Sequence, residues 1–383
     1  MKLDCLLKGI LHTAVRGHDA EITQIAYDSR HVEPGALFIC LRGEKFDGHK
    51  FAGQAAEAGA AAVLVEESGE YPDGLGVIRV ENTRKAMAAV SANFYGNPAD
   101  KLRLIGVTGT NGKTTTTYFI EEILRKCGRK TGIIGTVGIA ANGAKMDIPF
   151  STSTTPDPPE LHKIFAEMVS LGITDVVMEV SSHSLALFKM EGLCFDVGVF
   201  TNFTQDHLDF HGTMEEYKLA KAKLFAQSKF AVVNADDEAS ETMLHALAGK
   251  PFYTYGLDAD ADLKAIHIKY LEKTLFDLNE KRFELTNKGR FNIYNSLAAI
   301  GAAKALGLGI EEIKAAFNEG LSGVPGRIQS VPNARGLNVF VDYAHSPDGL
   351  VNIIEAVREL TAKRVITIFG CGGDRDPDKR PKM

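Results

Sequence analysis

The stretch LRLIGVTGTNGKTTTTYFI, residues 102–120, constrains the fold more than any other part of the sequence. It reads as an apolar strand, a turn with two glycines, and a helix whose apolar residues form one stripe. Glycines at such a turn let backbone N–H groups converge on an anion at the helix N-terminus, where the helix dipole also helps. The stretch therefore predicts a nucleotide site on an α/β sheet. Lys113 would reach the phosphates, and the Thr114 hydroxyl would hold Mg²⁺.

The loop departs from the usual phosphate-loop pattern at one position. The pattern G-x-x-x-x-G-K-[ST] requires a glycine five residues before Gly112, and Val107 stands there. Because the strand, the turn and the helix all remain, we expect the missing glycine to matter less than this context.

The composition bounds the class of protein. A chain of 383 residues with 45% hydrophobic and 24% charged residues is typical of a soluble protein of two or three domains. A net charge of −6 favours neither nucleic acid nor an anionic membrane as a partner. The five cysteines are scattered and form no C-x-x-C pair, which indicates reduced thiols and a cytoplasmic location. We expect no signal peptide and no membrane span.

Strand and helix patterns divide the chain into three units, at residues 1–99, 100–334 and 335–383. The first reads as a small α/β unit that ends where Asn97-Pro98 breaks a helix. In the second, nearly continuous apolar runs alternate with amphipathic helices. This alternation predicts a doubly wound, mostly parallel sheet with helices on both faces.

Some segments carry more specific expectations. The run KTGIIGTVG, residues 130–138, reads as one strand, and residues 261–291 read as two or three antiparallel strands. The third unit begins with a strand at 337–345, a helix at 346–360 and a strand at 364–373. It has too few residues to close a core of its own, so we expect the chain to be a fragment.

A nucleotide site needs a second metal ligand. Glu179 ends the apolar strand TDVVMEV, where a carboxylate is costly unless it is paired or metal-bound. The next strand ends in TNFTQDHLDFHGT, where His207 lies among acidic residues. A capped loop is the simpler interpretation there, because Mg²⁺ prefers oxygen ligands. The helix EEYKLAKAKLF carries Lys221 between two other lysines, and composition alone indicates a solvated face.

Eight motifs then occur in a recognisable order: GVTGTNGKTTT, MEVSSHSL, TNFTQDHLDFHGTMEEYKLAKAKLF, NADD, FNIYNSLAA, GVPGR, DYAHSPDGL and FGCGGDRD. Together they resemble the Mur ligases of peptidoglycan synthesis, over the whole chain. The resemblance implies an N-terminal UDP-binding domain, a central phosphate-loop ATPase and a C-terminal Rossmann-like domain, here incomplete. The loop of that family has the form GTNGKT, so Val107 is ordinary in it.

The resemblance also implies an activity. It is that of an ATP-dependent ligase adding meso-diaminopimelate or L-lysine to UDP-N-acetylmuramoyl-L-alanyl-D-glutamate through an acyl phosphate. The segment GCGGDRDPDKRP is more similar to the diaminopimelate type. Two Mg²⁺ ions, small-molecule substrates and a monomer are implied as well. In a fragment, the amine-transfer step should fail while substrate and ATP binding survive.

Matching the motifs residue by residue implies roles for particular side chains. The catalytic and metal positions are Lys113, Thr114, Glu179, His207 and a carbamylated Lys221, whose carbamate would be an anionic oxygen ligand. The ATP contacts are Gly109, Thr110, Asn111, Gly112, Lys113, Thr114, Thr115, Asn295, Arg327 and Asp342. The contacts to the UDP substrate are Tyr27, Ser29, Glu44, Lys45, Phe46, Thr154, Thr155, Ser181 and Lys189. Arg375 would contact the incoming amino acid.

One departure and several alternatives stand beside this interpretation. Phe188-Lys189 stands where the family usually has Gly-Arg, and lysine lacks the bidentate fork of arginine. A folylpolyglutamate synthase shares the loop and the carbamylated lysine, although that enzyme generally starts directly with the ATPase. A phosphate-loop switch acting through protein partners, or a non-catalytic ATP-binding regulator, also remains open.

Overall fold

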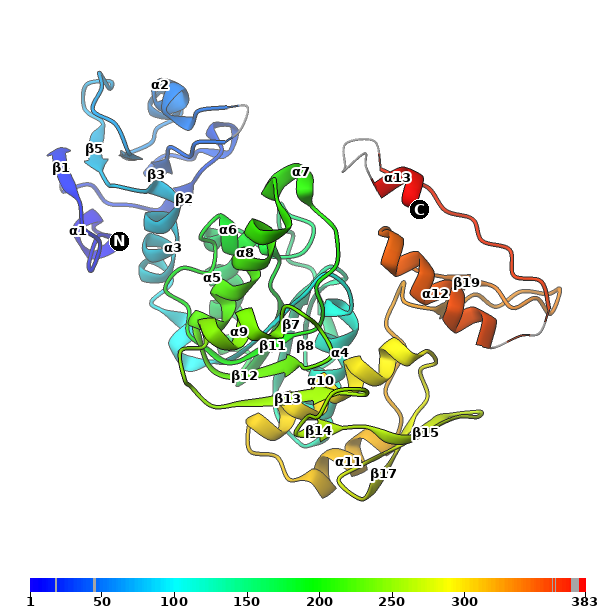
Figure 1. Ribbon diagram of the computed structural model, residues 1–383. Coiled ribbons are helices and arrows are strands. Elements are labelled where there is room, and N and C mark those ends of the chain that lie inside the picture. The colour runs from blue at the N-terminus through cyan, green and yellow to red at the C-terminus, as the bar shows by residue number, and fades with distance from the viewer. Residues whose placement is uncertain (18, 44–45, 360, 362, 373–378) are drawn as a thin grey trace.

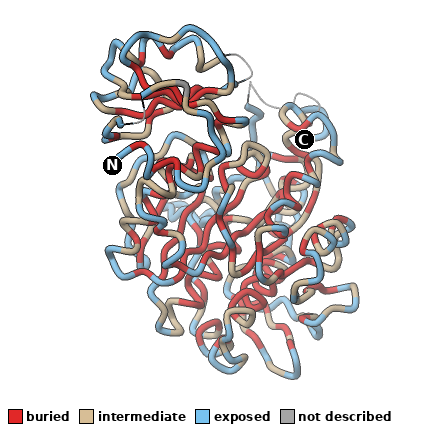
Figure 2. The backbone as a smooth tube through the Cα atoms, turned by 90° about the vertical axis from the view of Figure 1, so that its left-hand side faces the viewer, coloured by how far each residue is buried: buried red, intermediate tan, exposed pale blue. Residues whose placement is uncertain are grey.

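The computed structural model describes residues 1–383 except 18, 44–45, 360, 362 and 373–378. An N-terminal sheet, a larger central sheet and a C-terminal segment follow one another along the chain (Figure 1). Buried residues gather on the strands of the two sheets and on the helices against them, and the C-terminal segment carries few (Figure 2). Within the described residues, no helix is long and apolar enough to cross a membrane.

The N-terminal unit is a five-stranded sheet in the order β1-β5-β4-β3-β2, parallel except for β1. Its strands are β1 Thr13–Arg16, β2 Gln24–Ala26, β3 Ala36–Ile39, β4 Ala62–Val65 and β5 Gly76–Arg79. Its helices are α1 Leu3–Leu6, α2 Ala52–Glu57 and α3 Thr83–Phe94, with 3-10 turns η1 Ser29–His31, η2 Gly48–Phe51 and η3 Pro98–Lys101. Strands β3 and β4 are buried throughout, because helices cover both faces of the sheet.

The central unit is a nine-stranded sheet in the order β14-β13-β12-β11-β6-β10-β7-β8-β9. The strands are β6 Arg103–Thr108, β7 Thr131–Gly135, β8 Gly138–Ala141, β9 Ala144–Met146, β10 Asp175–Glu179, β11 Phe195–Phe200, β12 Ser228–Asn234, β13 Phe252–Gly256 and β14 Leu263–Lys264. Strands β14 to β7 run parallel, while β8 and β9 are antiparallel. The expected doubly wound α/β fold is confirmed.

Helices cover both faces of this sheet. They are α4 Lys113–Lys126, α5 Pro158–Ser170, α6 Ser182–Ala186, α7 Leu208–His211, α8 Met214–Ala226, α9 Ser240–Ala246, α10 Arg290–Ala305 and α11 Ile310–Asn318. Ile105 and Val107 pack in the core under α4 and α10, and Leu104 packs in the opposite core under α5 and α8. This alternation along one strand is what a sheet buried on both faces requires.

Of two further predictions for the central unit, one is confirmed and the other is wrong. The predicted antiparallel strands form, as β15 Ile266–Tyr270, β16 Thr274–Leu278 and β17 Lys281–Leu285. The prediction of one strand over 130–138 is wrong. The chain turns after Gly135, and β8 pairs back on β7 from Gly138, whose φ of 123° is accessible to glycine.

The C-terminal segment, residues 326–383, contains β18 Gln329–Ser330, β19 Phe340–Val341, α12 Pro347–Glu359 and α13 Lys379–Lys382. The predicted helix forms, and the predicted strand at 337–345 shrinks to β19. The predicted strand at 364–373 is wrong in its described part, residues 364–372, which form no ladder. A strand needs a hydrogen-bonded neighbour, and none lies beside this segment among the described residues. Ile366 and Ile368 are accordingly 68% and 94% exposed.

A partly buried group of ion pairs joins strands β6 and β10. Asp175 is fully buried at the start of β10, opposite Arg103 of β6 in the register. Arg103 donates to both of its carboxylate oxygens at 2.7 Å, and Arg129 donates at 2.9 Å. Removing one member of such a group leaves the others without their counter-charge.

We predict that Asp175→Asn lowers the unfolding free energy of the central unit by about 2–4 kcal/mol, discounted because Arg103 is half exposed. Calorimetry or urea unfolding measures the shift. The matched control is Asp147→Asn, whose pair with Lys145 is almost entirely exposed, and which should change stability by less than about 0.5 kcal/mol. Equal shifts in the two variants would contradict the prediction.

Candidate active site

The candidate site lies where the winding of the central sheet changes direction. Strand β6 lies between β10 and β11 in the sheet. After β6 the chain adds strands on the β10 side of β6 first, and then on the β11 side. In open α/β sheets, ligands bind in the crevice outside the carboxyl ends of strands at such a point. A cavity of about 670 Å³ opens there. The predicted residues that line it are Thr110, Asn111, Gly112, Lys113, Thr114, Thr115, Thr154, Thr155, Glu179, Ser181, Lys189, His207, Asn295, Arg327 and Asp342.

The loop between β6 and α4 has the close-packed glycines that its sequence predicts. Gly112 has a φ of 83°, and a Cβ there would lie 2.5 Å from Oδ1 of Asn295. At Gly109 a Cβ would lie 1.9 Å from the Thr201 hydroxyl. A residue outside the loop also holds it in place, because Oδ1 of Asn202 accepts a hydrogen bond from the backbone amide of Asn111 at 2.9 Å. Both glycines are therefore required by packing as well as by backbone conformation.

Lys113 is the first residue of α4, and its ammonium donates to the carbonyls of Gly109 and Thr110, each at 2.9 Å. Burial lowers the pKa of this lysine, and the charges of Glu179 and Asp206 oppose the shift. A cation held at the helix N-terminus and facing two carboxylates provides the positive field that a polyphosphate needs.

Glu179 ends β10 beside the loop, in register with Val107 of β6. Its side chain is 1% exposed. The carboxylate accepts from the Thr136 amide at 2.8 Å and from the Thr114 hydroxyl at 3.1 Å. Among the described residues it makes no ion pair. A buried carboxylate held by hydrogen bonds, next to a threonine hydroxyl, matches the oxygen ligands that Mg²⁺ prefers.

His207 lies on the loop after β11, with a left-handed φ of 54°. Burial lowers the pKa of its imidazole to about 3, against the opposing charge of Asp206 and with the help of His183. The ring is therefore neutral at pH 7, so that one of its nitrogens keeps a lone pair.

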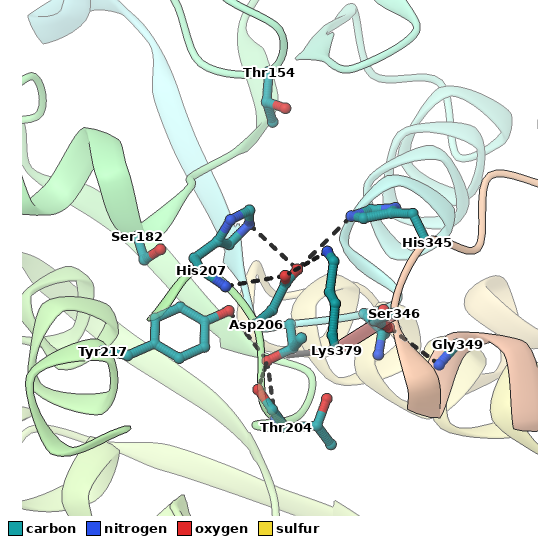
Figure 3. Close-up of polar contacts among 12 residues, drawn as sticks. Thr154, Ser182, Thr204, Asp206, His207, Tyr217, His345, Ser346, Gly349 and Lys379 are labelled. Atoms are coloured by element: carbon teal, nitrogen blue, oxygen red, sulfur yellow. Dashed lines mark hydrogen bonds and ion pairs between the residues drawn. The ribbon is translucent and has the colours of Figure 1, made fainter. Parts of the chain in front are cut away.

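Asp206 connects this loop to the C-terminal segment. His207, His345 and Lys379 converge on its carboxylate (Figure 3), at 3.4, 3.7 and 3.2 Å. Burial alone would raise the pKa of Asp206, but its interaction with His345 and the positive charge of Lys379 hold it below its usual value. The sequence predicted no role for His345 or Lys379, although His345 lies in the motif DYAHSPDGL and Lys379 is one of the final lysines.

Lys221 lies behind the loop, not in the wall of the cavity. Its side chain is 1% exposed on α8, and its amine donates to the Gly109 carbonyl at 2.9 Å. Burial moves its pKa well below the usual value, and the charge of Lys113 lowers it further. The solvated face that composition indicated is therefore wrong for Lys221, although Lys223 on the same helix is exposed.

The C-terminal segment reaches the loop through further polar contacts. Arg327 donates to the Thr114 hydroxyl at 2.8 Å, and Asn111 donates to Asp348 at 2.8 Å. Asp342 accepts from the Ile328 and Ala344 amides at 2.9 and 2.8 Å. Asp348 and Thr136 belong to this site and were not predicted: Asp348 lies within the motif DYAHSPDGL, whereas nothing in the local sequence marks Thr136.

The other end of the cavity carries the residues expected to contact a second substrate. Thr155 donates to the Glu179 carbonyl at 3.0 Å and accepts from the Ser181 amide at 3.1 Å. Thr154 lies 3.1 Å from the Thr136 hydroxyl, and Lys189 pairs with Asp157 at 2.9 Å. Thr155 thus contacts the backbone of Glu179, and Thr154 contacts Thr136, which donates to the Glu179 carboxylate.

The N-terminal candidates lie outside this cavity. Tyr27 lies 3.2 Å from the Ser151 hydroxyl, Ser29 donates to Gln54 at 3.0 Å, and Phe46 is 72% exposed. Burial raises the pKa of Tyr27. Glu44, Lys45 and Arg375 lie outside the described residues. The described part of the chain contains no group of three or more His, Cys, Asp or Glu residues that could share a metal ion.

The sheet order and the loop at its switch point define a phosphate-loop α/β protein with a second polar compartment beside the loop. Residues 21–95, 107–303 and 326–383 match, respectively, the descriptions "Mur ligase family, catalytic domain", "Mur ligase middle domain" and "Mur ligase, glutamate ligase domain". The chain belongs to the Mur ligase family, whose members are ATP-dependent ligases.

Individual relatives agree with this assignment. The chain is 42% identical over 396 aligned residues to the UDP-N-acetylmuramoyl-L-alanyl-D-glutamate--2,6-diaminopimelate ligase of Clostridium perfringens, covering 100% of this chain and 80% of that protein. A solved structure with the same enzyme name has a TM-score of 0.78 at 29% identity, covering 100% and 79%. Folylpolyglutamate synthase from Mycobacterium tuberculosis has a TM-score of 0.57 at 17% identity, covering 72% and 70%, and this shows the fold alone.

We predict that Gly112→Ala weakens MgATP binding about tenfold or more, because the added Cβ collides with Asn295 and displaces the loop. Isothermal titration calorimetry measures the affinity. Gly128→Ala is the matched control, since it imposes a similar φ of 80° but meets nothing within 4 Å. It should cost stability without changing the affinity by more than about twofold. An equal loss of affinity in both variants would refute the role of the collision.

Proposed function

We propose that the chain catalyses ATP-dependent amide formation between 2,6-diaminopimelate and UDP-N-acetylmuramoyl-L-alanyl-D-glutamate, in cytoplasmic synthesis of peptidoglycan precursors. The observation that supports it most is a single cavity in which the phosphate loop and the substrate-side residues Thr155, Ser181 and Lys189 meet. Relatives named for this reaction match the whole chain. L-Lysine is the alternative amino acid.

The first step joins the glutamyl carboxylate to the γ-phosphate of ATP. A carboxylate oxygen attacks phosphorus, the bond to the β-phosphate oxygen breaks, and ADP leaves. Attacking and leaving groups are all anionic, so the site must neutralise charge as the transition state forms. Lys113 at the helix N-terminus and Arg327 beside Thr114 are the cations placed for this.

The second step transfers the acyl group to the amine. The amine nitrogen attacks the acyl carbon, phosphate leaves, and the nitrogen loses a proton. The C-terminal segment already contacts the phosphate loop through Arg327 and Asp348. We propose that this contact, with Arg375, brings the amino acid to the cavity, as expected of a domain that closes on its substrate.

Mg²⁺ fits the residues around Glu179. Thr114 and Glu179 would hold one ion, and neutral His207 with a carbamylated Lys221 would hold a second. Bound Mg²⁺ would offset the charge of the phosphates during transfer. The protein's own part is to orient the Glu179 carboxylate through hydrogen bonds from Thr136 and Thr114.

Carbamylation of Lys221 has a physical basis in its surroundings. Only a neutral amine attacks CO₂, and burial beside Lys113 favours the neutral form. The attack forms an N–C bond and releases one proton, leaving a carboxylate on the former amine. The carbamate on Lys221 is then an anion beside the cation of Lys113, and the two attract each other.

The alternatives have less support. Folylpolyglutamate synthase resembles the chain over 72% of its length, against 100% for the diaminopimelate ligase structure. A switch acting through protein partners has no use for the polar compartment at Thr155 and Ser181. We also propose domain boundaries near residues 99 and 334, and a monomer.

The proposed function predicts binding of UDP-N-acetylmuramoyl-L-alanyl-D-glutamate, measured by calorimetry, and of MgATP. With both present, mass spectrometry should detect the acyl phosphate, and any amide product should form from diaminopimelate in preference to lysine. UDP alone and a folate substrate serve as comparison ligands. Failure of the UDP-dipeptide to bind, or tighter binding of the folate, would overturn the proposal.

We predict that ¹³C-labelled bicarbonate gives a protein carbamate signal in NMR that Lys221→Ala abolishes. Turnover should fall by about a hundredfold or more in that variant, because a metal ligand is lost. Lys218→Ala is the control, since Lys218 lies on the same helix and pairs with Glu215 at the surface. A carbamate signal that survives in Lys221→Ala would place the modification elsewhere.

A further inference from the structure

Phe188 adopts a backbone conformation that a bulky residue rarely tolerates. Its φ is 56°, in the left-handed region that favours glycine. It follows the short helix α6 and lies between Leu187 and Lys189, both of which line the cavity. Strain of this kind persists only where surrounding contacts over-determine the conformation. The contacts of the ring therefore indicate what holds it there.

Two lysine ammonium groups lie against the Phe188 ring. Lys85 Nζ and Lys223 Nζ are each 4.9 Å from the ring centroid. Lys85 belongs to α3 of the N-terminal unit, and Lys223 belongs to α8 of the central unit. A cation this close to an aromatic face is attracted by the ring quadrupole. The ring thus connects two units that are otherwise built on separate sheets.

A second polar contact also joins the N-terminal unit to the central unit. Tyr27 of the N-terminal unit donates to Glu160 at 3.3 Å and lies 3.2 Å from the Ser151 hydroxyl. Glu160 is the capping-box glutamate of α5, whose N-cap residue Asp157 pairs with Lys189. The Lys85–Phe188 contact therefore ends next to Lys189, and the Tyr27–Glu160 contact ends on α5, whose N-cap residue Asp157 pairs with Lys189.

We propose that Phe188 is a positioning residue that holds the N-terminal unit, through Lys85, in the orientation that a substrate spanning the two units requires. The inference rests on the proposed function, because only a ligand contacting Ser29 on one unit and Thr155 on the other depends on that orientation. ATP binds at the phosphate loop within the central unit and its C-terminal segment, so its affinity does not depend on this tie.

The test uses variants that separate the contact between the two units from the contact within the central unit. Phe188→Leu removes the aromatic face but keeps an apolar side chain, and Phe188→Tyr keeps the face. Lys85→Ala removes the crossing contact, and Lys223→Ala removes a contact to the same ring within the central unit. The last variant is the matched control.

The expected result is a split between the two substrates. Phe188→Leu and Lys85→Ala should each raise the KM or Kd for the UDP-dipeptide about two- to fivefold, the size expected of one partly exposed cation–π contact. The values for ATP, and kcat, should change by less than about twofold. Phe188→Tyr and Lys223→Ala should behave like the wild type. Equal weakening for ATP and the UDP-dipeptide, or unchanged values for both, would overturn the positioning role.

A double-mutant cycle of Lys85→Ala with Phe188→Leu, read by urea unfolding, tests the tie without any substrate. A nonzero coupling supports the tie, and additive effects overturn it whatever the ligase assay gives. If the wild type fails to bind the UDP-dipeptide while the coupling is present, the proposed function fails and the tie stands without that substrate role.

Discussion

The buried carboxylate of Glu179 is the interaction on which the site depends. It lies at the carboxyl end of β10, in register with Val107, so the pairing of two strands places it beside the phosphate loop. A carboxylate that is 1% exposed must be satisfied by its neighbours. Its donors come from the loop after β7 and from the start of α4, Thr136 and Thr114 respectively. Strand order thus fixes which side chains meet.

The sequence predicted those parts of the fold in which local pattern and tertiary environment agree. Apolar runs flanked by helices specified the parallel strands, because both faces of the sheet are buried. The strand expected at 364–373 shows the limit: its pattern is equally apolar, but a ladder requires a neighbour that pattern cannot supply. The turn after Gly135 was missed for a related reason, since the glycines of KTGIIGTVG fit either a strand or a hairpin.

The residues of the site also divide into those that the local sequence predicts and those that it does not. Gly112, Lys113 and Glu179 carry local signals, namely a turn before a helix and a charge at the end of an apolar strand. The signal at Lys221 is misleading, because the nearby Lys223 on α8 is exposed, and only the helical phase decides which amine is buried. Asp348 meets Asn111 across 237 residues of sequence. Such a contact depends on how the C-terminal segment folds back, which no short motif encodes.

Charge balance links the phosphate loop to the C-terminal segment. Lys113 lowers the pKa of Lys221, while Glu179 and Asp206 oppose the lowering at Lys113 itself. The cations of the C-terminal segment, Arg327 and Lys379, end on Thr114 and Asp206 respectively. Positive charge from one part of the chain and negative charge from another therefore meet at the loop. A polyphosphate arriving there would compete with Asp206 and Glu179 for the same cations, so binding of an anionic substrate and docking of the C-terminal segment must be energetically coupled.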